Sequence, residues 1–193
     1  DEALQVVIDR KVPLVPTFTF QANLADFGAA IGSDANLREV FRAEITESVG
    51  TLRAAFDAGV PLLTGSESGF SLTPYGDWHY RELQVFVEDL GMTPLQAIHS
   101  ATEQGARALK LEGELGCIKP GYLADILIFD GEPESVITQL GEQRRFKTIM
   151  KEGRVVDTST PLPKDWQLPG WRVSEYSERV LTRELVESMG LTP

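Results

Sequence analysis

The run VPLLTG at residues 60–65 decides the fold of this chain, because it is a short apolar segment that ends in a turn residue. A similar run, VPLVPTFTF, occupies residues 12–20, and its β-branched and aromatic side chains favour a buried strand. Between the two runs, apolar residues recur every three or four positions from Leu37 to Phe56, which predicts a long amphipathic helix that stops at Gly59. Strand, helix and strand in this order predict a βαβ unit with parallel strands, and therefore an α/β fold.

The segments around this unit predict further helices first and short strands later. Helices are expected over residues 1–10 and 79–90, and a third begins at Thr93, where Thr, Pro and Gln form a capping box. This third helix is interrupted near Gly105. The remaining expected elements are strands at residues 116–118, 124–130, 146–150 and 154–156, a hairpin at residues 151–154, and a helix over residues 174–189 of a proline-rich tail.

Composition excludes several classes of protein. The 18 Lys and Arg residues against 29 Asp and Glu residues give a net charge of −11, which argues against nucleic acid or an anionic membrane as partner. No apolar run reaches the roughly 18–20 residues of a membrane span and no signal peptide opens the chain, so a cytoplasmic location is expected. Cys117 is the single cysteine, which rules out an internal disulfide, and its strand-like surroundings predict a buried small side chain.

Three ordered motifs carry a resemblance to a known family. The first is LTGSESGF at residues 63–70 with HYREL at 79–83, and the second is GMTPLQAI at 91–98. The third pairs GCIKPGYLADI at 116–126 with MKEGRVV at 150–156. Together they resemble the amidohydrolase superfamily, nearest its imidazolonepropionase-like and prolidase-like members, over roughly residues 1–157.

The resemblance implies a position within a larger fold. It places residues 1–110 in the C-terminal part of a (β/α)8 TIM-type barrel, at about strands 7 and 8, and residues 111–157 in a small β-sandwich. Residues 158–193 form a tail outside the resemblance. Six barrel strands would then be missing, and a barrel closes only with all eight. We therefore expect the chain to fold beside the N-terminal remainder of the barrel, supplied either by the same protein or by a separate chain, with a second copy of this chain as a further expected partner.

The resemblance also implies a metal-dependent hydrolase with one or two divalent ions, expected to be zinc. The chain has two histidines and no His-x-His pair, whereas a hydrolytic metal site needs about three protein ligands. Most ligands must therefore lie outside this chain. Glu67 stands where the family has a catalytic aspartate, so it is the predicted metal ligand and catalytic carboxylate. Asp77 is the fallback carboxylate, and more simply an N-cap for its own helix.

The other candidate residues are assigned to the substrate pocket or to structure. Neither candidate serine has a base close in sequence that would make it a nucleophile. His99, inside a capped helix, is expected to be structural, and Asp125 is expected to bond turn amides. The predicted pocket residues are Ser66, Ser68, Tyr75 and His79, with Thr17 and Phe18 as further wall residues.

Two functions of different class remain. In the first, the chain is the C-terminal portion of an enzyme that hydrolyses amide or cyclic amide bonds of a small molecule through a metal-activated water, and it is inactive alone. In the second, it is a non-catalytic or degenerate amidohydrolase-like scaffold domain, which the glutamate in place of the aspartate favours.

Overall fold

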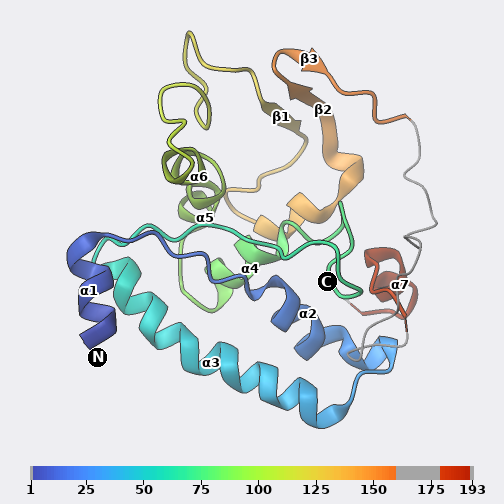
Figure 1. Cartoon of the computed structure of the whole chain (residues 1–193). Helices are drawn as coiled ribbons and strands as arrows, with labels where there is room; N and C mark the ends of the chain where they lie inside the picture. Colours follow the sequence, from blue (N-terminus) through green and yellow to red (C-terminus); the bar gives the residue numbers. More distant parts are fainter. Residues whose placement is uncertain (1, 160–178, 192–193) are drawn as a thin grey trace.

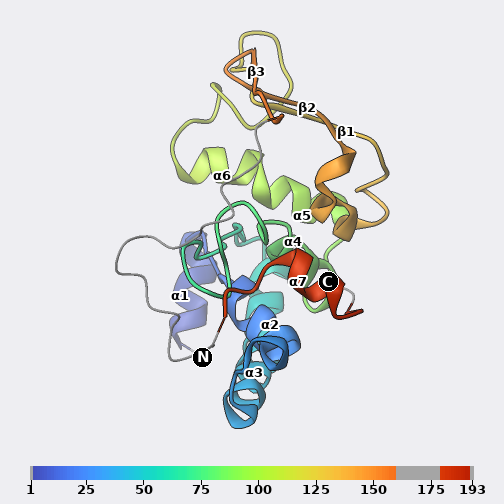
Figure 2. The same cartoon turned by 90° about the vertical axis from the view of Figure 1, so that its right-hand side faces the viewer.

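The computed structural model describes residues 2–159 and 179–191. Figure 1 shows α1, α2 and α3 at one end, the β-sheet at the other, and α4, α5 and α6 between them. After a quarter turn the same three levels remain distinct (Figure 2). The elements are α1 Glu2–Arg10, α2 Phe18–Phe27, η1 Gly28–Ile31, α3 Ala35–Asp57, α4 Arg81–Glu88, α5 Pro94–Ala101, α6 Glu103–Ala108, β1 Ile126–Phe129, η2 Ile137–Gly141, η3 Gln143–Arg145, β2 Phe146–Lys151, β3 Arg154–Val155 and α7 Arg183–Ser188.

The long helix α3 confirms the helical prediction. It begins after Asp34, whose carboxylate accepts hydrogen bonds from Asn36 N and Leu37 N at 2.9 and 3.2 Å. It ends just before Gly59, whose φ of +80° turns the chain back. The apolar face of α3 is half-buried and packs against α2 and the two clusters of buried side chains, as its spacing predicts.

In place of the two predicted strands, the structure has a single parallel bridge between Leu14 and Leu62. Leu14 N donates to Pro61 O at 3.0 Å, and Leu63 N donates to Leu14 O at 2.8 Å. The parallel orientation agrees with the βαβ prediction, but the extended ladder does not form within the described residues. Prolines at 13, 16 and 61 remove backbone donors, and two strands alone are marginal.

The predicted strand over residues 12–20 is wrong beyond Pro16. Thr17 has a left-handed backbone, with φ of 62°, and α2 begins at the next residue. Phe18, Thr19 and Phe20 are therefore buried helical residues. The chain turns because α2 packs its buried face against α3 and α4, a tertiary contact that local β propensity does not reveal.

Two clusters of buried side chains form the core. The first joins α2, α4 and α5 around Phe18, Leu62 and Phe86. The second gathers Phe20, Leu24, Phe27, Leu72, Trp78, Leu181 and Val186, with Trp78 stacked on Phe27 at 5.5 Å between ring centroids. The C-terminal tail therefore completes the second cluster.

The helix pair α5–α6 confirms the predicted capping box, but the break between the two helices lies at a different residue from the one predicted. Thr93 Oγ1 accepts from Gln96 N, and Gln96 Oε1 accepts from Thr93 N at 2.8 Å. The break lies at Thr102, with φ of −123° and ψ of −92°, and not at Gly105. Gly105 lies inside α6 and has helical neighbours on both sides.

The three-stranded antiparallel sheet β1-β2-β3 confirms the hairpin at residues 151–154. Glu152 and Gly153 both have positive φ, 51° and 76°, as the tightest hairpin turns require. Asp125 accepts from Glu152 N and from Lys151 Nζ, each at 2.7 Å, so its turn role is confirmed. The strand predicted at residues 116–118 is wrong, because this segment is a bend followed by irregular backbone with no strand partner among the described residues.

Part of the predicted C-terminal helix is present. Residues 174–178 lie outside the described residues, residues 179–182 are not helical, and α7 covers Arg183–Ser188. Thr182 caps α7 by accepting from Leu185 N at 3.1 Å, which sets the start of the helix later than apolar spacing suggests. Within the described ranges, no helix is long and apolar enough to cross a membrane.

Replacement of Gly65 by alanine should destabilise the fold. A Cβ at Gly65 would lie 2.6 Å from Val15 Cγ1 and 3.0 Å from Thr17 Oγ1, so the two segments joined by the Leu14–Leu62 bridge would be pushed apart. We expect Gly65→Ala to lower the free energy of unfolding by about 1–3 kcal/mol. Denaturant titration measures this, and Gly105→Ala, where no atom lies within 4 Å, is the control. Equal stability of both variants would contradict the packing argument.

Candidate functional site

The candidate site is the loop of residues 66–79, called here the site loop, which joins the Leu62 bridge to α4. Its first half is closed by Gly69 N donating to Thr73 O at 2.9 Å and by Thr73 Oγ1 donating to Glu67 O at 2.7 Å. Thr73 is buried, so its hydroxyl holds the middle of the loop to the backbone of Glu67 away from solvent. The loop therefore has a defined backbone that can hold side chains in place.

Glu67 occupies a left-handed backbone position at the start of the site loop, with φ of 48°. Such a conformation is uncommon for a residue with a Cβ, and sparsely populated backbone conformations are concentrated at functional sites. The side chain is exposed, and its carboxylate has no hydrogen bond or ion pair with the described residues. The carboxylate is therefore open to a ligand or to another polypeptide.

Ser66, Ser68 and His79 form a connected chain of hydrogen bonds. Ser66 Oγ lies 2.8 Å from Ser68 Oγ and 3.1 Å from His79 Nδ1. Gly76 N donates to His79 Nε2 at 3.2 Å, so Nε2 carries no proton and Nδ1–H donates to Ser66. Partial burial lowers the pKa of His79, with the Asp77 carboxylate opposing the shift, and the neutral ring is favoured.

This geometry corrects the expectation that no base lies near either serine. The fold brings His79 from the end of the site loop onto Ser66, thirteen residues away in sequence. In the tautomer set by Gly76, however, the imidazole donates to the serine and does not take its proton. The arrangement orients Ser66, so it is suited to hydrogen bonding a substrate and not to nucleophilic attack.

The remaining predicted pocket residues divide between surface and core. Tyr75 is exposed and its hydroxyl lies over Gly69, where an added Cβ would be 3.1 Å from the oxygen. Thr17 is half-buried and donates from Oγ1 to Val15 O at 3.2 Å, beside Gly65. Phe18 is buried in the core cluster, so the prediction that it lines a pocket wall is wrong.

Asp77 caps a helix, but not its own. Its Oδ2 accepts from Arg183 N at 2.8 Å, at the start of α7. Burial raises the pKa of Asp77, while the hydrogen bond and charge of Arg183 lower it. His99 lies on α5 with Nε2 at 3.1 Å from Glu103 Oε2, an exposed pair four residues apart, in keeping with a structural role.

Glu82 is a buried ionisable residue that the sequence did not single out. It is fully buried in α4, where its Oε2 accepts from Thr19 N at 2.8 Å and from Thr19 Oγ1 at 2.9 Å. The carboxylate thus serves as a remote cap for α2, since Thr17 provides no side-chain cap. Burial raises the pKa of Glu82 to about 7, and hydrogen bonds from the start of α2 oppose the rise.

The described residues supply at most part of a metal site. No group of three or more His, Cys, Asp and Glu side chains gathers within residues 2–159 and 179–191. A catalytic zinc ion takes three protein ligands and one water. The exposed Glu67 fits one ligand position, so the chain could share a centre but not hold it alone.

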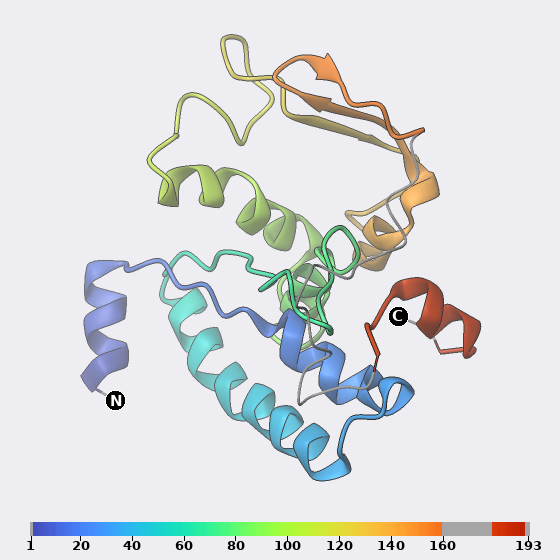
Figure 3. The same ribbon diagram turned by 45° about the vertical axis from the view of Figure 1, so that its right-hand side comes forward.

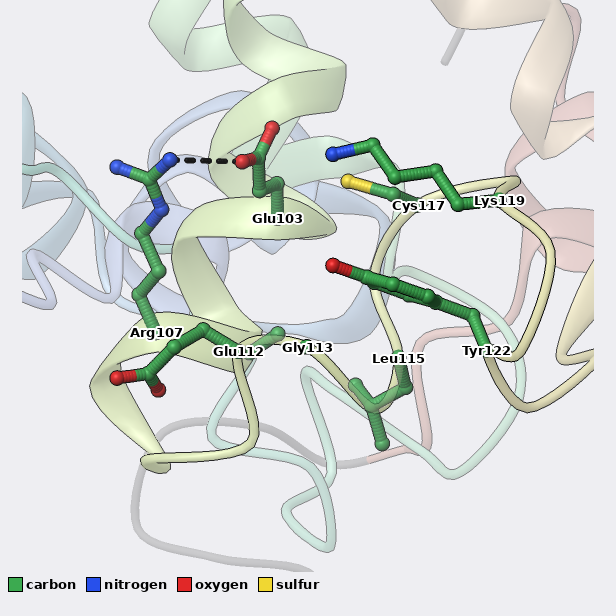
Figure 4. Close-up of a pocket in the computed structure, with 9 residues that line it drawn as sticks. Glu103, Arg107, Glu112, Gly113, Leu115, Cys117, Lys119 and Tyr122 are labelled. Atoms are coloured by element: carbon green, nitrogen blue, oxygen red, sulfur yellow. Dashed lines mark hydrogen bonds and ion pairs between the residues drawn. The ribbon is translucent and has the colours of Figure 1, made fainter.

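A cavity of about 570 Å³ lies apart from the site loop, between α6 and residues 112–122. Figure 4 shows Glu103 and Arg107 on one wall and Cys117, Lys119 and Tyr122 on the other. Cys117 is half-buried in a loop, so the prediction of a buried strand cysteine is wrong. Gly116, with φ of +88°, turns the chain before it and exposes the sulfur to this cavity.

Comparison with known proteins shows the family. The model of the Amidohydrolase family matches residues 13–156, which is most of the chain, and the chain belongs to this family. Imidazolonepropionase of Rhodococcus jostii is 38% identical over 78 residues, which are 40% of this chain and 19% of that protein. Ochratoxinase of Aspergillus niger is 31% identical over 104 residues, 53% of this chain and 21% of that protein.

Solved structures agree with the family. A Xaa-Pro dipeptidase with bound methionine superposes with a TM-score of 0.63 at 26% identity, covering 81% of this chain and 37% of that one. A prolidase from Bifidobacterium longum gives 0.67 at 25% identity, with 78% and 36% covered. The chain thus spans about a fifth of the length of its curated relatives and about 37% of these structures. It is a mixed α/β part of the amidohydrolase fold.

The buried carboxyl of Glu82 predicts a pH-dependent stability. Its folded-state pKa, about 7, lies above the roughly 4.3 of an unfolded glutamate, so between these values the folded state binds a proton that the unfolded state lacks. The free energy of unfolding should therefore fall as pH rises from about 4.5 to 7, with a slope of at most about 1.4 kcal/mol per pH unit. Chemical unfolding at pH 5, 6, 7 and 8 measures the slope.

Glu82→Gln is the matched variant, because the amide oxygen can still accept from Thr19 without titrating. We expect it to reduce the slope and to be more stable than the native chain at pH 8. Identical slopes for both proteins would show that Glu82 is not the titrating group.

Proposed function

We propose that this chain is the C-terminal portion of a metal-dependent amidohydrolase that hydrolyses amide or cyclic amide bonds of a small molecule. The observation that carries the proposal is the site loop. It follows the parallel Leu14–Leu62 bridge and holds Glu67, Ser66, Ser68 and His79 together at one end of that bridge. The names of the relatives, imidazolonepropionase and Xaa-Pro dipeptidase, support this class of substrate.

The paired segments around Leu14 and Leu62 would be strands 7 and 8 of a (β/α)8 barrel. Their single bridge leaves parallel edges that neighbouring strands would extend. In this assignment, residues 1–110 belong to the barrel, residues 111–157 to a β-sandwich domain and residues 158–193 to the tail. Ile128 and Val155, which the strand register places on one face of the small sheet, are 50% and 69% exposed, and this supports a further apolar layer against that face.

Glu67 is the proposed catalytic carboxylate and a ligand of the metal, which we take to be zinc. A divalent ion at this position would lower the pKa of a bound water and polarise the substrate carbonyl. Glu67 is free of other partners among the described residues, so its carboxylate can accept the proton of that water.

Ser66, Ser68, Tyr75 and His79 are the proposed substrate contacts. The neutral His79 and the two hydroxyls offer both donors and acceptors, and the exposed Tyr75 ring offers an apolar wall. A few convergent polar groups beside an aromatic surface are typical of small-molecule sites. The partners are then a small-molecule substrate and the N-terminal remainder of the barrel.

A second candidate function is a non-catalytic scaffold domain of the same family. The observation in its favour is that no group of three or more His, Cys, Asp and Glu side chains that could hold a metal ion gathers among the described residues. In a scaffold, Glu67 would be a solvated loop residue. Metal content of the complete protein separates the two functions.

Replacement of Glu67 by alanine should remove activity. Loss of a general base lowers kcat about 10²- to 10⁴-fold, and loss of a ligand should also reduce bound metal. The test measures metal content and hydrolysis of an imidazolone, an Xaa-Pro dipeptide and ochratoxin by the complete protein. Glu47→Ala, an exposed glutamate of α3, is the control and should leave both unchanged. Full activity of Glu67→Ala would refute the catalytic assignment.

Without the rest of the barrel, the parallel pair and the small sheet of the isolated chain should not melt in one cooperative transition with the helical core. The parallel pair and the small sheet both leave apolar or hydrogen-bonding surface uncovered, so little stability remains for these parts. Differential scanning calorimetry of the chain alone and of the chain co-expressed with its upstream sequence measures this. A sharp transition for the chain alone would contradict the barrel assignment.

A further inference from the structure

The last described segment, residues 179–191, lies against the site loop and is called here the C-terminal strap. Figure 3 shows α7 beside the end of α2 and below the turns of η2 and η3. Leu181 and Val186 are completely buried in the second core cluster with Trp78 and Leu72. The strap is therefore part of the folded core, although it lies beyond the family match that ends at residue 156.

Three backbone-directed hydrogen bonds attach the strap to the site loop. Leu181 N donates to Ser71 O at 2.7 Å, and Trp78 Nε1 donates to Leu181 O at 2.8 Å. Arg183 N donates to the Asp77 carboxylate at 2.8 Å. The contacts reach the loop at its middle and at its end, directly beside His79. Hydrogen bonds to a buried indole and a partly buried carboxylate are hard to exchange for water.

The side chain of Arg183 packs between the Tyr80 ring, just after the site loop, and Gly141 at the end of η2. Its guanidinium carbon lies 5.2 Å from the centre of the Tyr80 ring. An added Cβ at Gly141 would overlap with Arg183 Nη1 and would lie 2.6 Å from Tyr80 Cε1, so Gly141 leaves the space that the guanidinium fills. Gly141 of η2 therefore helps to seat the C-terminal strap, although it is distant from both the strap and the site loop in sequence.

We propose that the C-terminal strap is a positioning element of the active site, which holds the site loop so that His79 and Ser66 stay in their hydrogen-bonded arrangement. This inference rests on the proposed function for its catalytic consequence. Asp77, Trp78 and Arg183 are the positioning residues, since none of them lies in the Ser68–Ser66–His79 chain. The strap acts by restricting the residues on either side of His79.

Amide hydrogen exchange of the complete protein tests the proposal. Gly141→Ala should displace the Arg183 guanidinium, and Asp77→Ala should remove the acceptor of Arg183 N. In both variants we expect exchange of peptides from residues 66–79 to become about tenfold faster, while peptides from α3 and α5 stay unchanged. Asp77→Asn keeps an acceptor oxygen and should restore the native rate.

Kinetics supply the second readout. With hydrolysis established, Gly141→Ala and Asp77→Ala should raise KM several-fold at unchanged metal content, because the loop still carries every proposed contact but holds them less well. The control is Gly50→Ala in α3, where no atom lies within 4 Å, and it should alter neither exchange nor KM.

Two results would overturn the proposal. Unchanged exchange of residues 66–79 in both variants would show that the strap does not restrain the loop. Equal acceleration in α3, α5 and the loop would show that the strap only contributes to global stability. If Gly141→Ala fails to fold, the Asp77→Ala and Asp77→Asn pair decides alone. Exchange does not depend on activity, so an inactive protein would refute the proposed function without deciding this inference.

Discussion

The buried carboxylate of Glu82 at the start of α2 is the interaction on which the other elements depend. An ionisable group with no solvent exposure is unfavourable unless it is hydrogen-bonded. Here the amide and hydroxyl of Thr19 both donate to Oε2 of Glu82, whereas Oε1 has no hydrogen-bond partner among the described residues. The contact joins α2 and α4 through two residues, Thr19 and Glu82, that are 63 positions apart in the sequence. It fixes where α2 begins, and it fixes how α4 lies across it. Since the site loop leads directly into α4, the same carboxylate sets one end of that loop.

The other end of the site loop is set by close packing. At Gly65 the backbone passes so near Val15 and Thr17 that no side chain fits. Between these two ends, Thr73 makes a hydrogen bond within the loop, and Asp77 and Trp78 make hydrogen bonds to the C-terminal strap. A loop whose middle is buried and whose backbone is held at several points can present Glu67, Ser66 and His79 in one arrangement. Such preorganisation is what a binding or catalytic site requires.

Within the described residues, several backbone and side-chain groups that proteins normally pair or bury remain exposed. One parallel bridge cannot form a sheet, and apolar side chains of β1 and β3 face solvent. Glu67 offers a carboxylate with no partner in the described part of the chain. These features agree with a chain that covers about 37% of related amidohydrolase structures. The helical part, by contrast, has two well-packed clusters and satisfies its helix ends at Asp34, Thr93 and Thr182.

The sequence by itself determined the family, the long helix α3, the capping box of α5 and the hairpin at residues 151–154, because these depend on residues close together in the chain. It also indicated the site loop through Glu67. Only the tertiary structure decided that residues 18–20 are helical, because the cap comes from Glu82 and not from a neighbour. The pairing of His79 with Ser66, and of Asp77 with Arg183, likewise joins residues 13 and 106 positions apart. Local propensity and spacing carry no information about such contacts, since they arise when distant segments share one core.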